Sequence, residues 1–356
     1  MLPLAAPARI AYKTTKGEQN VGGRVEPLLA IRDLHTEFRT GTGIVRAADG
    51  VSWDVGPGET VAIVGESGSG KSVTALSVLR LIAEPPGRIT SGQIWFDGQD
   101  LLLLPPEAMR AVRGGAIGMV FQEPMTSLNP VLTIGRQITE TLEQHRGLDR
   151  GAAYQRAVEL LVMVGIADAA RRLKQYPHQL SGGMRQRVMI AIALACEPKL
   201  IIADEPTTAL DVTIQAQILE LMKSLTRRLG VALVIITHNL GVVARYANRV
   251  NVMYAGRIVE SGPATDIYHH PQHPYTMALL RSVPRLDRPR QTRLDPVEGQ
   301  PPDLTRLDAG CAFRPRCRFA VDACATARPA LAAAVDPGHL SACFRAEDLA
   351  VLGEAA

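Results

Sequence analysis

Hydrophobic and polar positions in the first third of the chain follow two rhythms, one typical of strands and one of helices. Residues 28–38 (LLAIRDLHTEF) and 50–55 (GVSWDV) predict short strands separated by the glycine-rich RTGTG turn. The apolar run of residues 59–65 (ETVAIVG) predicts a compact strand that enters a glycine cluster. Residues 71–82 (KSVTALSVLRLI) have helical spacing, so this part of the chain reads as a strand, a glycine turn and a helix.

The second half of the chain repeats the strand–helix–strand order. Residues 199–206 (KLIIADEP) and 231–238 (VALVIITH) are continuous apolar runs, as expected of strands covered on both faces. The amphipathic segment at 213–229 (TIQAQILELMKSLTRRL) predicts a helix between them. This order predicts an α/β fold with a parallel sheet covered by helices.

Other segments add smaller units. Residues 91–101 (SGQIWFDGQDL) predict a strand pair with its turn at Asp97-Gly98. Residues 130–175 are rich in helix formers, and 185–198 (RQRVMIAIALACEP) predict a helix that is ended by proline. We therefore expect a helical subdomain at about 125–185.

Three regions are predicted along the chain. Residues 1–26 lack sustained periodicity and are expected to be a flexible tail, and residues 27–283 hold the periodic segments. Beyond about residue 283 proline, arginine and glycine rise and periodicity fades, which predicts a separate C-terminal region at 284–356 with a boundary near 265–285.

Composition and charge exclude some classes of protein. The 356 residues are 46% hydrophobic and 21% charged, and a net charge of +4 is too small to indicate a nucleic-acid partner. No apolar run approaches the roughly 20 residues needed to cross a bilayer. The first basic residue follows a proline-broken apolar stretch, the wrong order for a secretory signal. We therefore expect a cytosolic protein, in which the five cysteines serve as metal ligands or inert thiols and not as disulfides.

A phosphate-binding loop is predicted between the strand at 59–65 and the helix at 71–82. The sequence GESGSGKS fits G-x-x-x-x-G-K-[ST] in the strand–helix context that this motif requires. Backbone N–H groups and the helix N-terminus would bind phosphate oxygens, Lys71 would reach the β- and γ-phosphates, and Ser72 would bind Mg²⁺. The alternative is a flexible Gly/Ser loop without a ligand. The residues of this loop are Gly65, Glu66, Ser67, Gly68, Ser69, Gly70, Lys71 and Ser72.

Two strand ends carry polar side chains suited to hydrolysis. Asp204 ends one strand and suits a Mg²⁺ shell, and Glu205 next to it is placed to polarise an attacking water. His238 ends the next strand and can donate a hydrogen bond to a terminal phosphate. The alternatives are a solvated surface acid at Glu205 and a structural histidine at 238. Following a phosphate loop, the three together predict a nucleotide-hydrolysing cleft.

A second anion-binding helix start follows at residues 180–188 (LSGGMRQRV). With this stretch the chain, from about residue 28 to 283, resembles the ABC transporter ATPases. The resemblance implies the P-loop fold of that family: a parallel core sheet, an antiparallel β subdomain and a helical subdomain. It also implies that Ser181, Gly182 and Gly183 cap ATP held by an opposite subunit. Gln122 in VFQEP resembles the loop that contacts Mg²⁺, and Ala209–Asp211 resembles the D-loop.

Further stretches resemble the ATPases of peptide importers, most closely the first ATPase subunit of dipeptide and oligopeptide uptake systems. These stretches are MVFQEPMTSLNPVLTIGRQI, HQLSGGMRQRVMIAIAL, HHPQHPYTMALLRSVP and the cysteine-containing tail. The resemblance implies a peripheral protein on the cytoplasmic face of the membrane, paired with a second ATPase subunit beneath two permeases that an extracytoplasmic peptide-binding protein supplies. Its cofactors would be ATP and Mg²⁺. Rival hypotheses are a soluble ABC ATPase acting on nucleic acid or on iron–sulfur assembly, an importer of nickel or haem, and a regulatory redox module.

Two positions depart from the common family pattern. Met184 stands where many ABC proteins have glutamine, a choice that peptide importers often share. The aromatic residue that stacks on adenine has no counterpart in TGTGIV, and Phe38 is the nearest substitute. A plain core role for Phe38 is an equal alternative.

Four cysteines gather near the end of the chain with the spacing C-x5-C-x6-C-x18-C. This is neither the paired C-x2-C of zinc ribbons nor the ferredoxin pattern, so chemistry alone leaves a metal centre and unligated thiols equally open. The resemblance favours a [4Fe–4S] cluster, with Zn²⁺ or no metal as alternatives. These cysteines are Cys311, Cys317, Cys324 and Cys343, whereas Cys196 in an apolar helix is expected to be a buried small hydrophobe.

Overall fold

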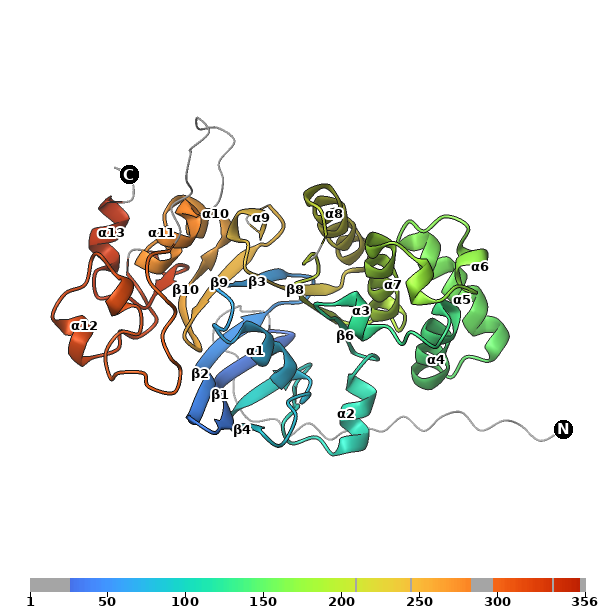
Figure 1. Cartoon of the computed structure of the whole chain (residues 1–356), viewed down its shortest axis with the longest axis horizontal. Coiled ribbons are helices and arrows are strands. Elements are labelled where there is room, and N and C mark those ends of the chain that lie inside the picture. Colours follow the sequence, from blue (N-terminus) through green and yellow to red (C-terminus); the bar gives the residue numbers. More distant parts are fainter. Residues whose placement is uncertain (1–25, 209, 244, 283–296, 335, 353–356) are drawn as a thin grey trace.

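The computed structural model describes residues 26–208, 210–243, 245–282, 297–334 and 336–352. Its central element is an eight-stranded sheet in the order β11-β12-β10-β9-β3-β8-β7-β6, of which β9, β3, β8, β7 and β6 run parallel (Figure 1). The bounds are β3 Thr60–Val64, β6 Ile117–Val120, β7 Leu200–Asp204, β8 Ala232–Thr237, β9 Arg249–Tyr254, β10 Arg257–Pro263, β11 Ala332–Ala333 and β12 Leu340–Ser341. The predicted strands at 59–65, 199–206 and 231–238 are thus confirmed as neighbours, and β6, β9 and β10 lie outside the predicted strands.

Both faces of the parallel sheet are covered. In β7, Ile201 and Ala203 pack into the core of the helical subdomain, while Leu200 and Ile202 pack into the core beneath the antiparallel sheet. Successive residues of the strand face opposite sides of the sheet, and both sides are buried in apolar cores. The strand therefore has to be apolar throughout, as its sequence is. The predicted α/β class is therefore confirmed.

The antiparallel sheet has the order β2-β1-β4-β5 and packs against α1 (Lys71–Val78). Strand β1 matches its predicted bounds closely, whereas β2 and β4 begin earlier than the sequence predicts. Register shifts interrupt the pairing of β1 with both partners, which obscures the apolar alternation. The predicted turn at Asp97-Gly98 is confirmed, and both residues have positive φ values, 50° and 78°. The bounds are β1 Leu29–Thr40, β2 Gly43–Val55, β4 Gly87–Phe96 and β5 Gln99–Asp100.

The helical subdomain lies on the far side of α8 (Val212–Leu229) from the C-terminal region (Figure 1). Its long helices contact one another through a common apolar core, which confirms the predicted helical segment. Its bounds are α3 Pro124–Ser127, α4 Ile134–Arg146, α5 Arg150–Met163, α6 Ala169–Arg172, η1 Pro177–Gln179 and α7 Gly182–Leu194. The remaining helices are α2 Pro106–Val112, α9 Leu240–Val243, α10 Ala264–His269, α11 Pro274–Arg281, η2 Arg314–Arg316, α12 Ala323–Thr326 and α13 Ala346–Leu352.

The C-terminal region is joined to the central sheet. Strand β12 pairs with β10, and β11 pairs with β12. The buried Glu260 of β10 contacts His339 Nε2 at 2.8 Å through its Oε1 atom. The domain limits 27–283 and 284–356 stay predictions, and the predicted tail before residue 26 and the segment 284–296 lie outside the described residues.

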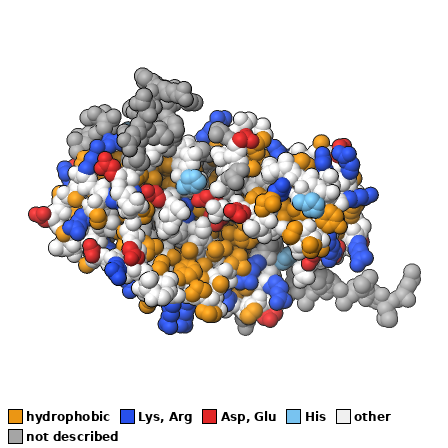
Figure 2. Space-filling model, viewed as in Figure 1, with side chains coloured by type: hydrophobic (Ala, Val, Ile, Leu, Met, Phe, Trp, Pro, Cys, Tyr) orange, Lys and Arg blue, Asp and Glu red, His pale blue; other side chains and the backbone are white. Residues whose placement is uncertain are grey.

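The surface offers no membrane-crossing element within the described ranges, since none of their helices is both long and apolar enough to traverse a bilayer. On the face shown in Figure 2, acidic and hydrophobic side chains meet near the centre of the molecule. In Figure 1 the antiparallel sheet, α1 and the parallel sheet converge at the same place. That junction contains the predicted phosphate loop.

Candidate nucleotide site

The phosphate loop connects β3 to α1. Gly70 precedes the helix in a left-handed conformation, φ 103°, and a Cβ atom there would clash with the backbone oxygen of Ala47. Only glycine meets both demands, so the motif's second glycine is required by local geometry. The loop then leads directly into the N-terminus of α1, where free backbone N–H groups favour an anion.

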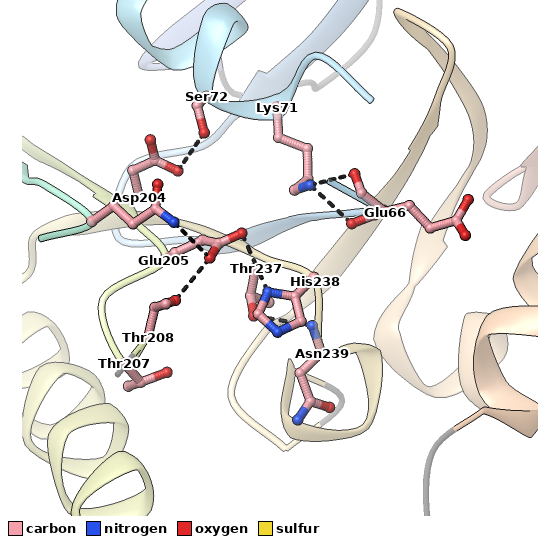
Figure 3. Close-up of polar contacts among 12 residues, drawn as sticks. Glu66, Lys71, Ser72, Asp204, Glu205, Thr207, Thr208, Thr237, His238 and Asn239 are labelled. Atoms are coloured by element: carbon pink, nitrogen blue, oxygen red, sulfur yellow. Dashed lines mark hydrogen bonds and ion pairs between the residues drawn. The ribbon is translucent and has the colours of Figure 1, made fainter. Parts of the chain in front are cut away.

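Lys71 is buried and turned back over the loop. Its Nζ atom donates to the backbone oxygens of Gly65 at 2.8 Å and Glu66 at 2.9 Å (Figure 3). Burial lowers the pKa of Lys71, while the nearby carboxylates of Glu205 and Asp204 oppose the shift. The ammonium group is thus held at the loop by carbonyl oxygens that a phosphate can replace.

Ser72 and Asp204 bring two oxygen ligands together. The Ser72 hydroxyl donates to Oδ1 of Asp204, the last residue of β7, at 2.9 Å. Burial raises the pKa of Asp204, and the bond from Ser72 opposes that shift. A hydroxyl beside a carboxylate is a hard donor pair of the kind that Mg²⁺ prefers, so both residues fit the predicted metal contact.

Glu205 lies at the centre of a polar cluster. Its Oε2 atom accepts from Gln122 Nε2 at 3.1 Å and from Thr208 Oγ1 at 2.7 Å, and its Oε1 atom lies 3.3 Å from His238 Nδ1 (Figure 3). Burial alone would raise the pKa of Glu205, but the bonds from Thr208 and His238 and the charge of Lys71 lower it. The carboxylate is therefore ionised at neutral pH and able to accept a proton.

The structure thus brings the predicted polar residues of three strand ends to one place. Gln122 follows β6, Glu205 follows β7 and His238 follows β8. Because these strands run parallel, their carboxyl ends meet at the same edge of the sheet. Gln122 contacts Glu205 here, so its direct contact with Mg²⁺ stays a prediction.

The Ser-Gly-Gly stretch lies elsewhere, at the N-terminus of α7. Ser181 caps this helix by accepting from the Met184 N–H at 3.4 Å, and a Cβ atom at Gly183 would contact Ile214 of α8. Asp211 caps α8 by accepting from the Ile214 N–H at 3.0 Å. Ser181 and Gly182 are exposed, Gly183 is partly buried, and the stretch belongs to a different subdomain from α1 (Figure 1); its contact with another subunit's ATP stays a prediction.

Three other predicted positions have mixed outcomes. Phe38 is partly buried near the end of β1, where its ring would meet a Cβ atom at Gly87, and adenine stacking by this ring stays a prediction. Ala209 of the predicted D-loop lies outside the described residues. Cys196 is 3% exposed and contacts the backbone of Thr141, which confirms the predicted buried thiol.

The four C-terminal cysteines lie in one region. The backbone N–H of Cys311 donates to Cys324 at 2.9 Å, and the pKa of the Cys343 thiol is raised to about 11 by burial and by the other three thiols. Across the described residues, no three His, Cys, Asp or Glu side chains are close enough to hold one metal ion. Within these ranges the thiols therefore gather without forming a compact single-ion site.

Three contacts at the site were not predicted. Thr208 donates to Glu205, Tyr275 Oη accepts from the Glu66 N–H at 2.7 Å, and Arg316 pairs with the Glu66 carboxylate. Tyr275 and Arg316 come from segments more than two hundred residues away, so periodicity carries no signal for them. Thr208 lies three residues after Glu205, a spacing at which a hydroxyl can reach back.

Comparisons with known proteins agree with this geometry. A family model described as ABC transporter matches residues 48–208, and one described as oligopeptide/dipeptide transporter, C-terminal region, matches residues 259–324. The chain is 57% identical over 335 residues to a putative peptide import ATP-binding protein of Brucella melitensis, covering 91% of this chain and 99% of that protein. It is 54% identical over 298 residues to the oligopeptide transport ATP-binding protein OppD of Bacillus subtilis, covering 84% and 83%.

A solved structure shares the fold. The dimeric structure of an ATP-binding cassette in a post-hydrolysis state, bound to ADP and phosphate, has a TM-score of 0.60 at 31% identity and covers 66% of this chain and 98% of that one. The phosphate loop, the carboxylates at the strand ends and the extent of the matches lead to one assignment. The chain belongs to the ABC transporter family, among the ATP-binding subunits of peptide importers.

Proposed function

We propose that this chain hydrolyses ATP to drive peptide import through a membrane permease. The observation that carries the proposal is the Glu205 carboxylate, held ionised by three partners at the sheet edge beside Lys71. A fixed base next to a phosphate loop suits phosphoryl transfer to water.

The residues divide the work of hydrolysis. Backbone N–H groups of the loop and the Lys71 ammonium bind the phosphates, and Ser72 with Asp204 would hold Mg²⁺, which neutralises charge on the phosphate oxygens. Glu205 accepts the proton of the attacking water, and His238 and Gln122 orient the carboxylate and the terminal phosphate. Release of phosphate removes the charge that holds the site closed.

We further propose that the working unit is a heterodimer with a second ATPase subunit. The Ser181–Gly183 stretch supports this, because it begins helix α7 and offers a second anion-binding N-terminus, separate from the phosphate loop of the same chain. A nucleotide held by the partner subunit would bind there. Asp211 caps the neighbouring α8 at the same exposed edge.

The proposed assembly places the ATPase pair on the cytoplasmic face of the membrane, beneath two membrane-spanning permeases that an extracytoplasmic peptide-binding protein supplies. Large apolar side chains close to Gln122 in the sequence are exposed, with Phe121 39%, Met125 62% and Val131 77% exposed. Exposed apolar groups of this kind mark protein interfaces, and a permease loop docked there would sense the Gln122–Glu205 contact.

We also propose that Cys311, Cys317, Cys324 and Cys343 hold a [4Fe–4S] cluster. Four thiols close enough to raise one another's pKa suit iron–sulfur chemistry, and a cluster that offers each ligand its own iron tolerates wider sulfur spacing than one ion does. Because burial raises the pKa values of the Cys311, Cys317 and Cys343 thiols, binding of a cluster would release protons.

Iron, sulfide and zinc analysis of anaerobically purified protein tests this. A cluster gives a broad visible absorption band that Cys317→Ser should remove and Cys196→Ala should leave intact. Zinc without the band would replace the proposal with a zinc site, and protein with neither metal would refute it.

The function itself is tested in the reconstituted transporter. Glu205→Gln keeps the size of the side chain but removes the base, so ATP turnover and peptide uptake should both fall by about 10²–10⁴-fold while ATP-bound dimers accumulate. Wild-type turnover in this variant would disprove the assignment of Glu205. Strong stimulation of ATPase activity by DNA, without binding to permease, would overturn the transport role.

A further inference from the structure

An ion pair connects the phosphate loop to the cysteine-containing region. The Glu66 carboxylate accepts from Arg316 Nη1 at 2.7 Å and from Nη2 at 2.9 Å, a two-pronged contact that only arginine offers. The Arg316 side chain is 4% exposed. The Glu66 side chain is 24% exposed, so salt screens this pair less than it screens a pair on the open surface.

Arg316 is fixed by every donor it has. Besides Glu66, its N–H groups donate to the backbone oxygens of Glu298 at 2.7 Å and Val297 at 3.2 Å and to Tyr254 Oη at 3.3 Å. These bonds use all of the guanidinium donors. The group also lies 5.8 Å from the ring centres of Tyr254 and Phe313.

The position of Arg316 depends on the cysteine segment. It ends the short helix η2, whose backbone bonds run from Arg314 N–H to Cys311 and from Cys317 N–H to Arg314. Cys311 and Cys317 flank the turn that carries Arg316, so any ligand that both cysteines bind would also fix the position of Arg316.

Glu66 is held in a definite direction. Its backbone N–H donates to Tyr275, its backbone oxygen accepts from Lys71, and its side chain points away from the Lys71 ammonium (Figure 3). A released carboxylate would be five residues from Lys71 and free to compete with phosphate for it. It would also add a negative charge beside the nucleotide.

We propose that Arg316 is a positioning residue of the nucleotide site, which raises ATP affinity by neutralising Glu66 and holding its carboxylate away from Lys71. The inference rests on the proposed ATP site. It gives the C-terminal region an energetic connection to nucleotide binding, and by linkage nucleotide binding strengthens the hold on Arg316 in turn.

Titration of the purified full chain with a fluorescent ATP analogue and Mg²⁺ tests the proposal. Arg316→Gln should raise the dissociation constant about tenfold, because it leaves the half-buried Glu66 carboxylate without its partner beside the phosphate loop. ATPase assays should show the same rise in KM with kcat little changed. In a Glu66→Gln background, which has no carboxylate to release, the same Arg316 change should weaken binding by less than about threefold.

Arg328→Gln is the matched control. Arg328 also anchors the C-terminal region, through Asp49 at 3.1 Å and the backbone of Asp308 at 2.8 Å, but it does not contact Glu66. Its loss should leave the dissociation constant unchanged. Equal losses from the Arg316 and Arg328 variants would show a docking role and overturn the proposal.

The remaining outcomes are also decisive. An Arg316→Gln protein that binds as wild type does, or whose defect is the same in the Glu66→Gln background, overturns the inference. If Arg316→Gln does not fold, Arg316→Lys is used for the test. It should raise the dissociation constant about threefold, and this rise should disappear in the Glu66→Gln background. Failure of the wild-type chain to bind the analogue would instead refute the proposed ATP site.

Discussion

Acid should destabilise this protein through the buried histidine His273. His273 caps α11, is 2% exposed and accepts from the Tyr275 N–H at 3.1 Å through Nδ1. Burial lowers the pKa of His273 to about 3, although a hydrogen bond with the Ala342 backbone opposes the shift. The ring is therefore neutral in the folded protein, and unfolding, which exposes it to water, lets it gain a proton.

The sign and size of the effect follow from linkage. Free histidine has a pKa of 6.5, so between that pH and about pH 3 the unfolded chain binds more protons than the folded one. Stability contributed by the neutral ring is complete above pH 6.5 and falls as pH is lowered. At about 1.36 kcal/mol per pH unit, lowering the pH from about 7.5 to about 5 costs roughly 2 kcal/mol from this residue.

The measurement is denaturant unfolding at both pH values for wild type and His273→Asn. Asparagine keeps an acceptor for the Tyr275 N–H but does not titrate in this range, and all other ionisable groups are common to both proteins. Between the two pH values, wild type should lose about 2 kcal/mol more stability than the variant. Equal losses would refute the argument, whatever the variant's absolute stability.

Two predictions concern the nucleotide site. Gly70→Ala should abolish binding of Mg²⁺–ATP in a fluorescence titration, because the new Cβ atom clashes with the backbone of Ala47. Gly68→Ala has open space around its Cβ atom and should add only backbone strain of about 1–2 kcal/mol. Equal losses of ATP affinity in the two variants would refute the steric account. Thr208→Val removes a bond that lowers the pKa of Glu205, so the acid limb of the kcat profile should move to higher pH; an unmoved limb would show that Glu205 does not titrate in catalysis.

Local patterns predict the parts of the site that lie on consecutive residues. The strand, loop and helix around Lys71 follow one another directly, and the apolar runs before Glu205 and His238 identify buried parallel strands. Since parallel strands bring their carboxyl ends to one edge, the meeting of these side chains can be predicted without the structure.

Contacts between distant segments cannot be read this way. Arg316 looks like one of several basic residues in a proline-rich segment, and only folding places it on Glu66. Strand β2 begins seven residues before the predicted strand, because register shifts against β1 conceal its alternation. The joining of β12 to β10 escaped prediction because a pairing of two residues has no detectable period.

The pairing of β12 with β10 also protects a sheet edge. Glu260 and Ser261 face Ser341 and Leu340 across this pair, and the Ala342 N–H donates to Val259 at 2.8 Å. A chain cut before residue 330 would leave the backbone N–H and C=O groups of β10 open to any other extended strand, a known route to aggregation. The cysteine-containing region thus keeps the ATPase sheet from pairing with its own copies, in addition to whatever its thiols bind.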